Sequence, residues 1–136
     1  MINFRSSNIS VESIGSDGSL TPAPGSPVEN RGGPNSIVIT PKGRFVYVSN
    51  ENNNTVSGYK LHSDGTLTHV PNSPFATGSV PFGLAVDSTG KFLYVANYGG
   101  NSVSGYSINS NGSLASLPGS PYPAANLPRA VLVTPR

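Results

Sequence analysis

The chain has 136 residues, among them 16 Gly and 13 Pro, and together with Ser and Asn these types make up nearly half of the sequence. This composition favours turns and short strands and argues against helical domains. Only 10% of the residues are charged and the net charge is +2, so we expect no nucleic-acid partner. Cysteine is absent, which excludes disulfides and thiolate metal sites. No apolar run reaches the length of a signal peptide or membrane span, so we expect no membrane association and, by default, a cytoplasmic location.

The first 33 residues predict only part of a sheet. Alternating apolar residues favour strands at 8–14 and 19–21, with a short stub at 2–4. These runs correspond to the outer strands of the two fuller units that follow in the chain. We therefore interpret residues 1–33 as a partial unit that lacks its innermost strand.

Two full units follow, at residues 34–80 and 81–127, and each contains four short apolar or alternating runs divided by turn residues. The predicted strands are 36–40, 45–49, 55–61 and 66–70 in the first unit and 83–87, 92–96, 102–108 and 113–117 in the second. Gly43, Gly65 and Gly112 stand where a tight hairpin needs a positive φ. The last segment, 128–136, repeats the start of a unit and predicts an innermost strand at 130–134.

These units are copies of one repeat of 47 residues. Pro34, Pro81 and Pro128 share one position in it, and an ungapped alignment of 34–80 with 81–127 gives 17 identities. Four antiparallel strands repeated at this period, with no amphipathic helix between them, are typical of the blades of a β-propeller. The sequence therefore predicts an all-β fold with about three propeller blades.

Three blades form an open arc, because each blade of a propeller covers the apolar faces of its neighbours. We expect a second copy to close the ring. The innermost strand in 128–136 of one chain would complete the blade begun by 1–33 of the other, so that a homodimer has six blades. Two other interpretations stay open: a fragment of a longer single-chain propeller, or three chains in a ring of nine blades.

One unit also resembles a known family. The segments 81–97, 101–106, 112–114 and 119–121 are similar to a blade of the seven-bladed lactonase family, which includes bacterial phosphogluconolactonases and fungal carboxymuconate-lactonizing enzymes. The resemblance extends over essentially the whole chain through the copies of the repeat. It implies a propeller fold and, for the family's enzymes, chemistry on a lactone ring.

The loops at one end of a propeller surround the mouth of its central channel, where ligands usually bind. The sequence places several polar and aromatic side chains there: Arg5, Asn35, Ser36, Glu51, Asn52, Phe82, Tyr98 and Arg129. Asn35, Phe82 and Arg129 share one repeat position and should ring the mouth. Because Arg offers a bidentate fork to carboxylate or phosphate, this set predicts a small anionic or sugar-like ligand.

The family resemblance also points to two weak catalytic candidates. Active-site blades of the family read Gly-Pro-Arg-His before the innermost strand and Val-Asn-Glu after the second strand. This chain has Pro128-Arg129-Ala130 and Ser49-Asn50-Glu51, so the Arg and the Glu match, but they lie in different repeats and the His is Ala. Lactone hydrolysis needs a base and an electrophilic group, which Glu51 and Arg129 could supply if the fold brings them together.

The sequence predicts no metal site and no cofactor. His62 and His69 lie far from the predicted mouth, and no phosphate-binding Gly-rich loop or metal-ligand motif is present. The leading hypothesis is a self-assembling scaffold or binding module that is not an enzyme. The alternative is a lactone hydrolase or lactonizing enzyme acting on a sugar or muconate-type lactone.

Overall fold

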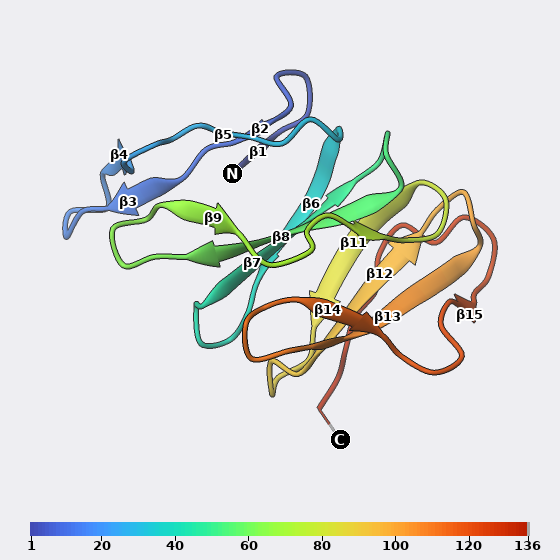
Figure 1. The fold of residues 1–136 in the computed structure, drawn as a ribbon. Helices are drawn as coiled ribbons and strands as arrows, with labels where there is room; N and C mark the ends of the chain where they lie inside the picture. The colour runs from blue at the N-terminus through green and yellow to red at the C-terminus, as the bar shows by residue number, and fades with distance from the viewer. Residues whose placement is uncertain (136) are drawn as a thin grey trace.

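The computed structural model describes residues 1–135, in which all the regular structure is β-strand (Figure 1). In chain order the strands are β1 (Ile2–Asn3), β2 (Asn8–Ile9), β3 (Glu12–Ile14), β4 (Leu20–Pro22), β5 (Val28–Glu29), β6 (Pro34–Ile39), β7 (Phe45–Asn50), β8 (Thr55–Leu61), β9 (Leu67–His69), β10 (Phe75–Ala76), β11 (Pro81–Val86), β12 (Phe92–Asn97), β13 (Ser102–Ile108), β14 (Leu114–Ser116) and β15 (Tyr122–Pro123). No helix among these residues is long and apolar enough to cross a membrane.

The strands form one partial and two fuller antiparallel blades, as predicted. The first blade consists of the sheet β1-β2-β5 and the hairpin β3-β4. The second has the order β6-β7-β8, with β9 and β10 both paired to β8, and the third repeats this arrangement in β11 to β15. The innermost strands β6 and β11 lie close together, and β1 lies near β6 (Figure 1). The chain is therefore an arc of propeller blades.

The outer edge of each blade differs from the predicted single fourth strand. It consists of two short pieces, joined by a turn that contains a Ser-Pro pair. In every blade the hydroxyl of this Ser accepts a hydrogen bond from a backbone amide, which belongs to the third strand in the two fuller blades and lies between β2 and β3 in the first. The acceptors are Ser26, Ser73 and Ser120, and the donors are Val11, Gly58 and Gly105, at 3.0, 2.9 and 2.9 Å. This bond explains why the Ser-Pro pairs recur with the period of the repeat.

The C-terminal segment also differs from the prediction. Residues 130–134 form no strand, and Arg136 lies outside the described residues. The segment approaches β11, where the amide of Gly83 donates to the carbonyl of Arg129 at 3.0 Å. A strand needs continuous pairing on at least one side, and no second strand of a fourth blade is present in 1–135 to provide it.

Side chains of β7 alternate between the two interfaces of the middle blade. Phe45 and Tyr47 pack toward the third blade in a core with Leu93 and Val95, whereas Val46 and Val48 pack toward the first blade. The alternation follows from the two-residue period of a strand. Because both of its faces are covered, all six residues of β7 are buried.

Gly58 and Gly105 occupy the middle of the third strand because the neighbouring side chains leave no room for a Cβ atom. A Cβ at Gly58 would lie 2.8 Å from Val70 Cγ2 and 3.0 Å from Tyr47 Cε1. A Cβ at Gly105 would lie 3.0 Å from the ring of Tyr122. Close packing therefore accounts for these glycines.

An asparagine at the end of each second strand, half-buried in the first blade and buried in the other two, ties that strand to the third. Its amide group donates two hydrogen bonds across the connecting turn. Asn3 donates to Asn8 and Ser10, Asn50 to Thr55 and Ser57, and Asn97 to Ser102 and Ser104, over distances between 2.7 and 3.0 Å. The repetition in all three blades indicates a structural role.

Tyrosine hydroxyl groups connect neighbouring blades. Tyr47 donates to the carbonyl of Gly112 at 2.8 Å, and Tyr59 donates to the Asn30 side chain at 3.2 Å. Tyr106 donates to the carbonyl of Ala76. Burial raises the pKa of all three phenols. The folded arc therefore keeps these tyrosines protonated at a pH at which an unfolded chain would begin to lose their protons.

We expect the stability of the arc to fall as the pH rises above about 10, the pKa of an unfolded tyrosine. A raised folded-state pKa gives stability that is present below the unfolded value and lost above it, with a limiting slope of about 1.4 kcal/mol per pH unit for each such group. Tyr47→Phe should lower stability at neutral pH and flatten this decline. Urea unfolding at a series of pH values measures both effects. Tyr122→Phe is the control, and an equal slope in the wild type and Tyr47→Phe would contradict the prediction.

Candidate functional site at the mouth of the arc

Irregular pairing in the innermost strands shapes the mouth of the arc. In the second blade Pro34 pairs with Asn50 and Ser36 with Ser49, so Asn35 is an extra residue. The register of β11 shifts in the same way between Pro81 and Leu84. Bulges of this kind redirect side chains and are frequent beside functional sites.

The second blade contributes a hydrogen-bonded amide and carboxylate to the mouth. Asn35 Nδ2 donates to Glu51 Oε2 at 2.8 Å, and both side chains are half-buried. The backbone amide of Ser36 donates a hydrogen bond to Ser49 Oγ at 3.0 Å, which links the innermost strand to the second strand. Ser49 Oγ in turn donates to the carbonyl of Phe82 at 2.6 Å, which joins the second and third blades at this end.

The third blade contributes two aromatic rings that lie beside Arg129. The centroids of Phe82 and Tyr98 are 5.2 Å apart. The guanidinium carbon of Arg129 lies 5.8 Å from the Phe82 centroid and 5.1 Å from the Tyr98 centroid. A guanidinium within about 6 Å of ring centroids is attracted by the rings, so Phe82 and Tyr98 hold the exposed Arg129 near the mouth.

The structure joins five of the predicted residues in two groups, but it does not pair the two catalytic candidates. Glu51 of the second blade contacts Asn35, whereas Arg129 contacts the aromatic rings of the third blade. Among residues 1–135 the ion pair is Arg31 with Glu29, on the exposed surface. Glu51 and Arg129 therefore belong to separate groups within one chain.

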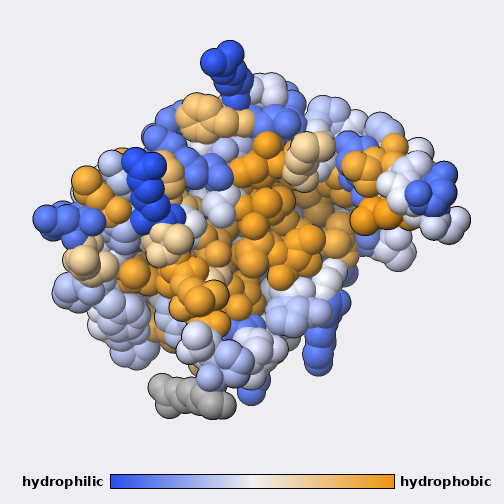
Figure 2. Space-filling view, turned by 180° about the vertical axis from the view of Figure 1, so that it is seen from behind, coloured by the Kyte–Doolittle hydropathy of each residue, from blue (hydrophilic) through white to orange (hydrophobic). Residues whose placement is uncertain are grey.

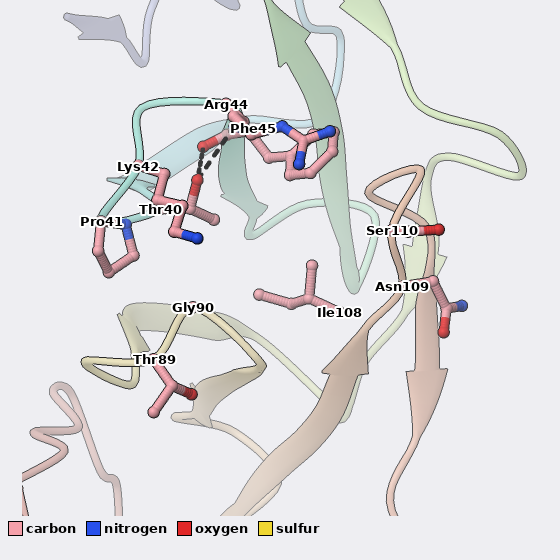
Figure 3. A pocket seen from close by; sticks show the side chains of 10 residues that line it. All are labelled: Thr40, Pro41, Lys42, Arg44, Phe45, Thr89, Gly90, Ile108, Asn109 and Ser110. Carbon is pink, nitrogen blue, oxygen red and sulfur yellow. Dashed lines mark hydrogen bonds between the residues drawn. The ribbon is translucent and has the colours of Figure 1, made fainter.

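A cavity that the sequence did not predict lies at the end of the blades opposite to these residues, and its lining is drawn in Figure 3. It has a volume of about 170 Å³ between the β6–β7 and β11–β12 turns. Its lining consists of Thr40, Pro41, Lys42, Arg44, Phe45, Thr89, Gly90, Ile108, Asn109 and Ser110. No carboxylate or His is among these residues, so the cavity offers no general base of the kind that the mouth offers in Glu51.

His62 directly follows β8, and His69 is the last residue of the outer strand β9. His62 contacts Thr68 Oγ1 at 2.8 Å, and the ring of His69 packs on Tyr59 with centroids 4.5 Å apart. Within 1–135 no group of three or more His, Cys, Asp or Glu residues could hold a metal ion.

Comparison with known protein families identifies the fold. The family described as "Lactonase, 7-bladed beta-propeller" matches residues 3–121 of the chain. The chain belongs to this lactonase family. None of the curated protein sequences matches it.

Solved structures of the lactonase family and related propellers are similar to the arc. A protein from Bacteroides fragilis, proposed to be a 6-phosphogluconolactonase, is 25% identical with a TM-score of 0.80, over 95% of this chain and 36% of that one. A protein from Bacteroides uniformis with the same proposed activity is 22% identical with a TM-score of 0.84, over 97% and 39%. The periplasmic gluconolactonase of Pseudomonas aeruginosa is 18% identical with a TM-score of 0.78, over 91% and 36%. This chain thus spans little more than a third of the length of these lactonase-like proteins.

Proposed function

We propose that the mouth of the arc binds an anionic sugar lactone and hydrolyses it. The observation that carries this proposal is the position of Arg129 over Phe82 and Tyr98, next to a blade that presents the Asn35–Glu51 pair. Membership of the lactonase family and the likeness to gluconolactonase structures support the same chemistry. These similarities favour an enzyme over the scaffold that the sequence first suggested.

In this proposal, different residues bind the ring and the anionic group of the sugar. Phe82 and Tyr98 offer apolar ring surface against which the carbon skeleton of a sugar packs. Arg129 offers paired N–H donors to a phosphate or carboxylate on the sugar. The aromatic pair therefore fixes the ring, and the guanidinium selects for negative charge.

Glu51 supplies the base in this proposal. Its carboxylate takes a proton from a water molecule as the water oxygen attacks the lactone carbonyl carbon. The bond between that carbon and the ring oxygen then breaks, and the ring oxygen takes the proton from Glu51 to become a hydroxyl group, which restores the carboxylate. Asn35 holds the carboxylate through its 2.8 Å hydrogen bond and leaves the other carboxylate oxygen for water.

Replacement of Arg129 tests the binding role. Arg129→Ala should raise the KM for a phosphorylated sugar lactone about tenfold, the value of one charge-assisted hydrogen bond, and should leave the KM of an uncharged lactone unchanged. Arg31→Ala, which removes an exposed arginine that pairs with Glu29, is the control. The measurement is initial-rate hydrolysis of a panel of charged and uncharged lactones.

Two outcomes would contradict the proposal. The wild-type chain hydrolyses none of the lactones in the panel, or Arg129→Ala changes the KM of charged and uncharged lactones equally. The first outcome argues against an enzyme. The second argues against the binding role of Arg129.

A further inference from the structure

We propose that an apolar groove between the first and second blades binds the C-terminal segment of a second copy of this chain. The groove has a volume of about 380 Å³ and is open to solvent on one side. It is lined by Met1, Ile9, Ser10, Val11, Glu12, Ile14, Leu20, Ile37, Ile39, Val46, Leu61 and Leu67. Figure 2 shows a face of the molecule on which hydrophobic surface extends across the middle. Ile14, Leu20 and Ile39 are exposed large apolar residues of this lining.

The interface between the second and third blades shows what occupies the equivalent place when a blade is complete. There, Val38 of the innermost strand β6 packs in the core with Leu84, Val86 and Leu93 of the third blade. In the repeat of 47 residues, Leu84, Val86 and Leu93 of the third blade correspond to Ile37, Ile39 and Val46 of the second blade. These three residues line the groove. The groove is therefore the site that a residue equivalent to Val38 would fill.

Leu132 is that residue. Leu132 lies two repeats of 47 residues after Val38, in the segment that repeats the start of β6. Its side chain is 85% exposed, the largest value among the exposed large apolar residues. A leucine gains about 1.5–3 kcal/mol on full burial, so Leu132 has a strong tendency to enter an apolar site.

The orientation of the C-terminal segment suits this contact. Val131 and Val133 are half-buried, whereas Leu132 between them faces solvent, so the segment alternates as an innermost strand does. The bond from Gly83 N to Arg129 O anchors the segment to its own third blade. Leu132 is thus presented outward, toward the blade that would come next in the ring.

The first blade presents a matching free edge. Its sheet ends at β1, and within residues 1–135 no strand pairs with β1 on the side away from β2. An unpaired edge beside an apolar groove favours the addition of a strand from another chain. By the register of β6 with β7, the second copy's Pro128 and Ala130 would lie opposite Asn3 and Ile2 of β1 while its Leu132 fills the groove. A twofold axis would repeat the contact at the other end of the arc.

This association would also complete the mouth. In the chain, Arg129 contacts Phe82, which precedes it by one repeat, at the mouth. By the same repeat geometry the second copy's Arg129 would lie next to Asn35, which holds Glu51. This consequence for catalysis rests on the proposed function, whereas the association itself does not.

Particle mass in solution tests the association. Light scattering coupled to size-exclusion chromatography should give twice the chain mass of 14.0 kDa for the wild type. Leu132→Asp should raise the dissociation constant of the dimer about 100-fold, because each dimer buries two copies of Leu132. Leu127→Asp, an exposed leucine outside the predicted strand, should leave it unchanged. A wild-type mass of one or three chains would overturn the proposal, whether or not the protein hydrolyses lactones.

Cysteine pairs identify the contact. The chain has no cysteine, so Leu132→Cys and Ile39→Cys each introduce a single thiol. Mild oxidation of a mixture of the two variants should give a disulfide-linked pair of chains, because the two positions meet across the interface. A mixture of Leu127→Cys with Ile39→Cys should give none. Equal cross-linking in both mixtures, or none in either, would overturn the proposed contact.

Discussion

Glu51→Gln is expected to lower kcat for lactone hydrolysis about 100-fold, because general-base catalysis typically contributes a factor of at least this size. The amide keeps the size of the side chain but cannot accept a proton from the attacking water. The carbonyl oxygen of Gln can still accept the hydrogen bond that Asn35 donates to Glu51, so the side chain should stay in place. KM should change little, since Arg129 and the aromatic pair bind the substrate.

Steady-state kinetics on a phosphorylated sugar lactone measure this effect, with Glu29→Gln as the matched control. Glu29 is exposed and pairs with Arg31 at 3.0 Å. Circular dichroism and the unfolding transition should be the same for the wild type and both variants. A kcat for Glu51→Gln that equals the wild-type value would remove Glu51 from the mechanism while leaving the binding role of Arg129 open to its own test.

Asn50→Ala is expected to lower the free energy of unfolding by about 3 kcal/mol. A loss of stability of this size is usual when one member of a buried hydrogen-bond network is removed. Asn50 is 2% exposed. Its amide group donates to Thr55 and Ser57, and its oxygen accepts from Asn30 Nδ2 at 2.8 Å. The truncation leaves Asn30 Nδ2 without its acceptor and opens a cavity between the first two blades.

Urea unfolding with a shared m-value measures this loss. Asn53→Ala is the control, because Asn53 is exposed and makes a single long hydrogen bond of 3.4 Å; it should cost less than about 0.5 kcal/mol. Asn50→Asp keeps the volume and removes the two donors, so it separates hydrogen bonding from packing. If Asn50→Ala costs no more than Asn53→Ala, the asparagine does not hold the blades together.

The blades could be predicted because their signals repeat. Pro34, Pro81 and Pro128 set the period, and Gly43 and Gly112 mark hairpins that the structure contains. The division of the outer strand could not be predicted in the same way. The Ser73 hydroxyl competes for the amide of Gly58, and a contact between a side chain and a distant backbone group leaves no trace in hydrophobic periodicity.

The candidate site was predicted as a set of residues but not as an arrangement. Repeat position alone placed Asn35, Phe82 and Arg129 at one end of the blades. The stacking of Arg129 on two rings depends on bulges in β6 and β11, which shift the register by a residue. Such a shift depends on how neighbouring strands meet, so spacing in the sequence does not reveal it.

The tie between the Ser-Pro hydroxyl and the third strand gives each blade a means of holding its outer edge without help from its neighbours. Tyr59 and Tyr106, which lie one repeat apart, then form hydrogen bonds across the two successive junctions between blades. A tandem copy of residues 34–80 inserted after residue 80 would find suitable partners on both sides already encoded. Gene duplication could therefore lengthen such an arc without the evolution of any new surface.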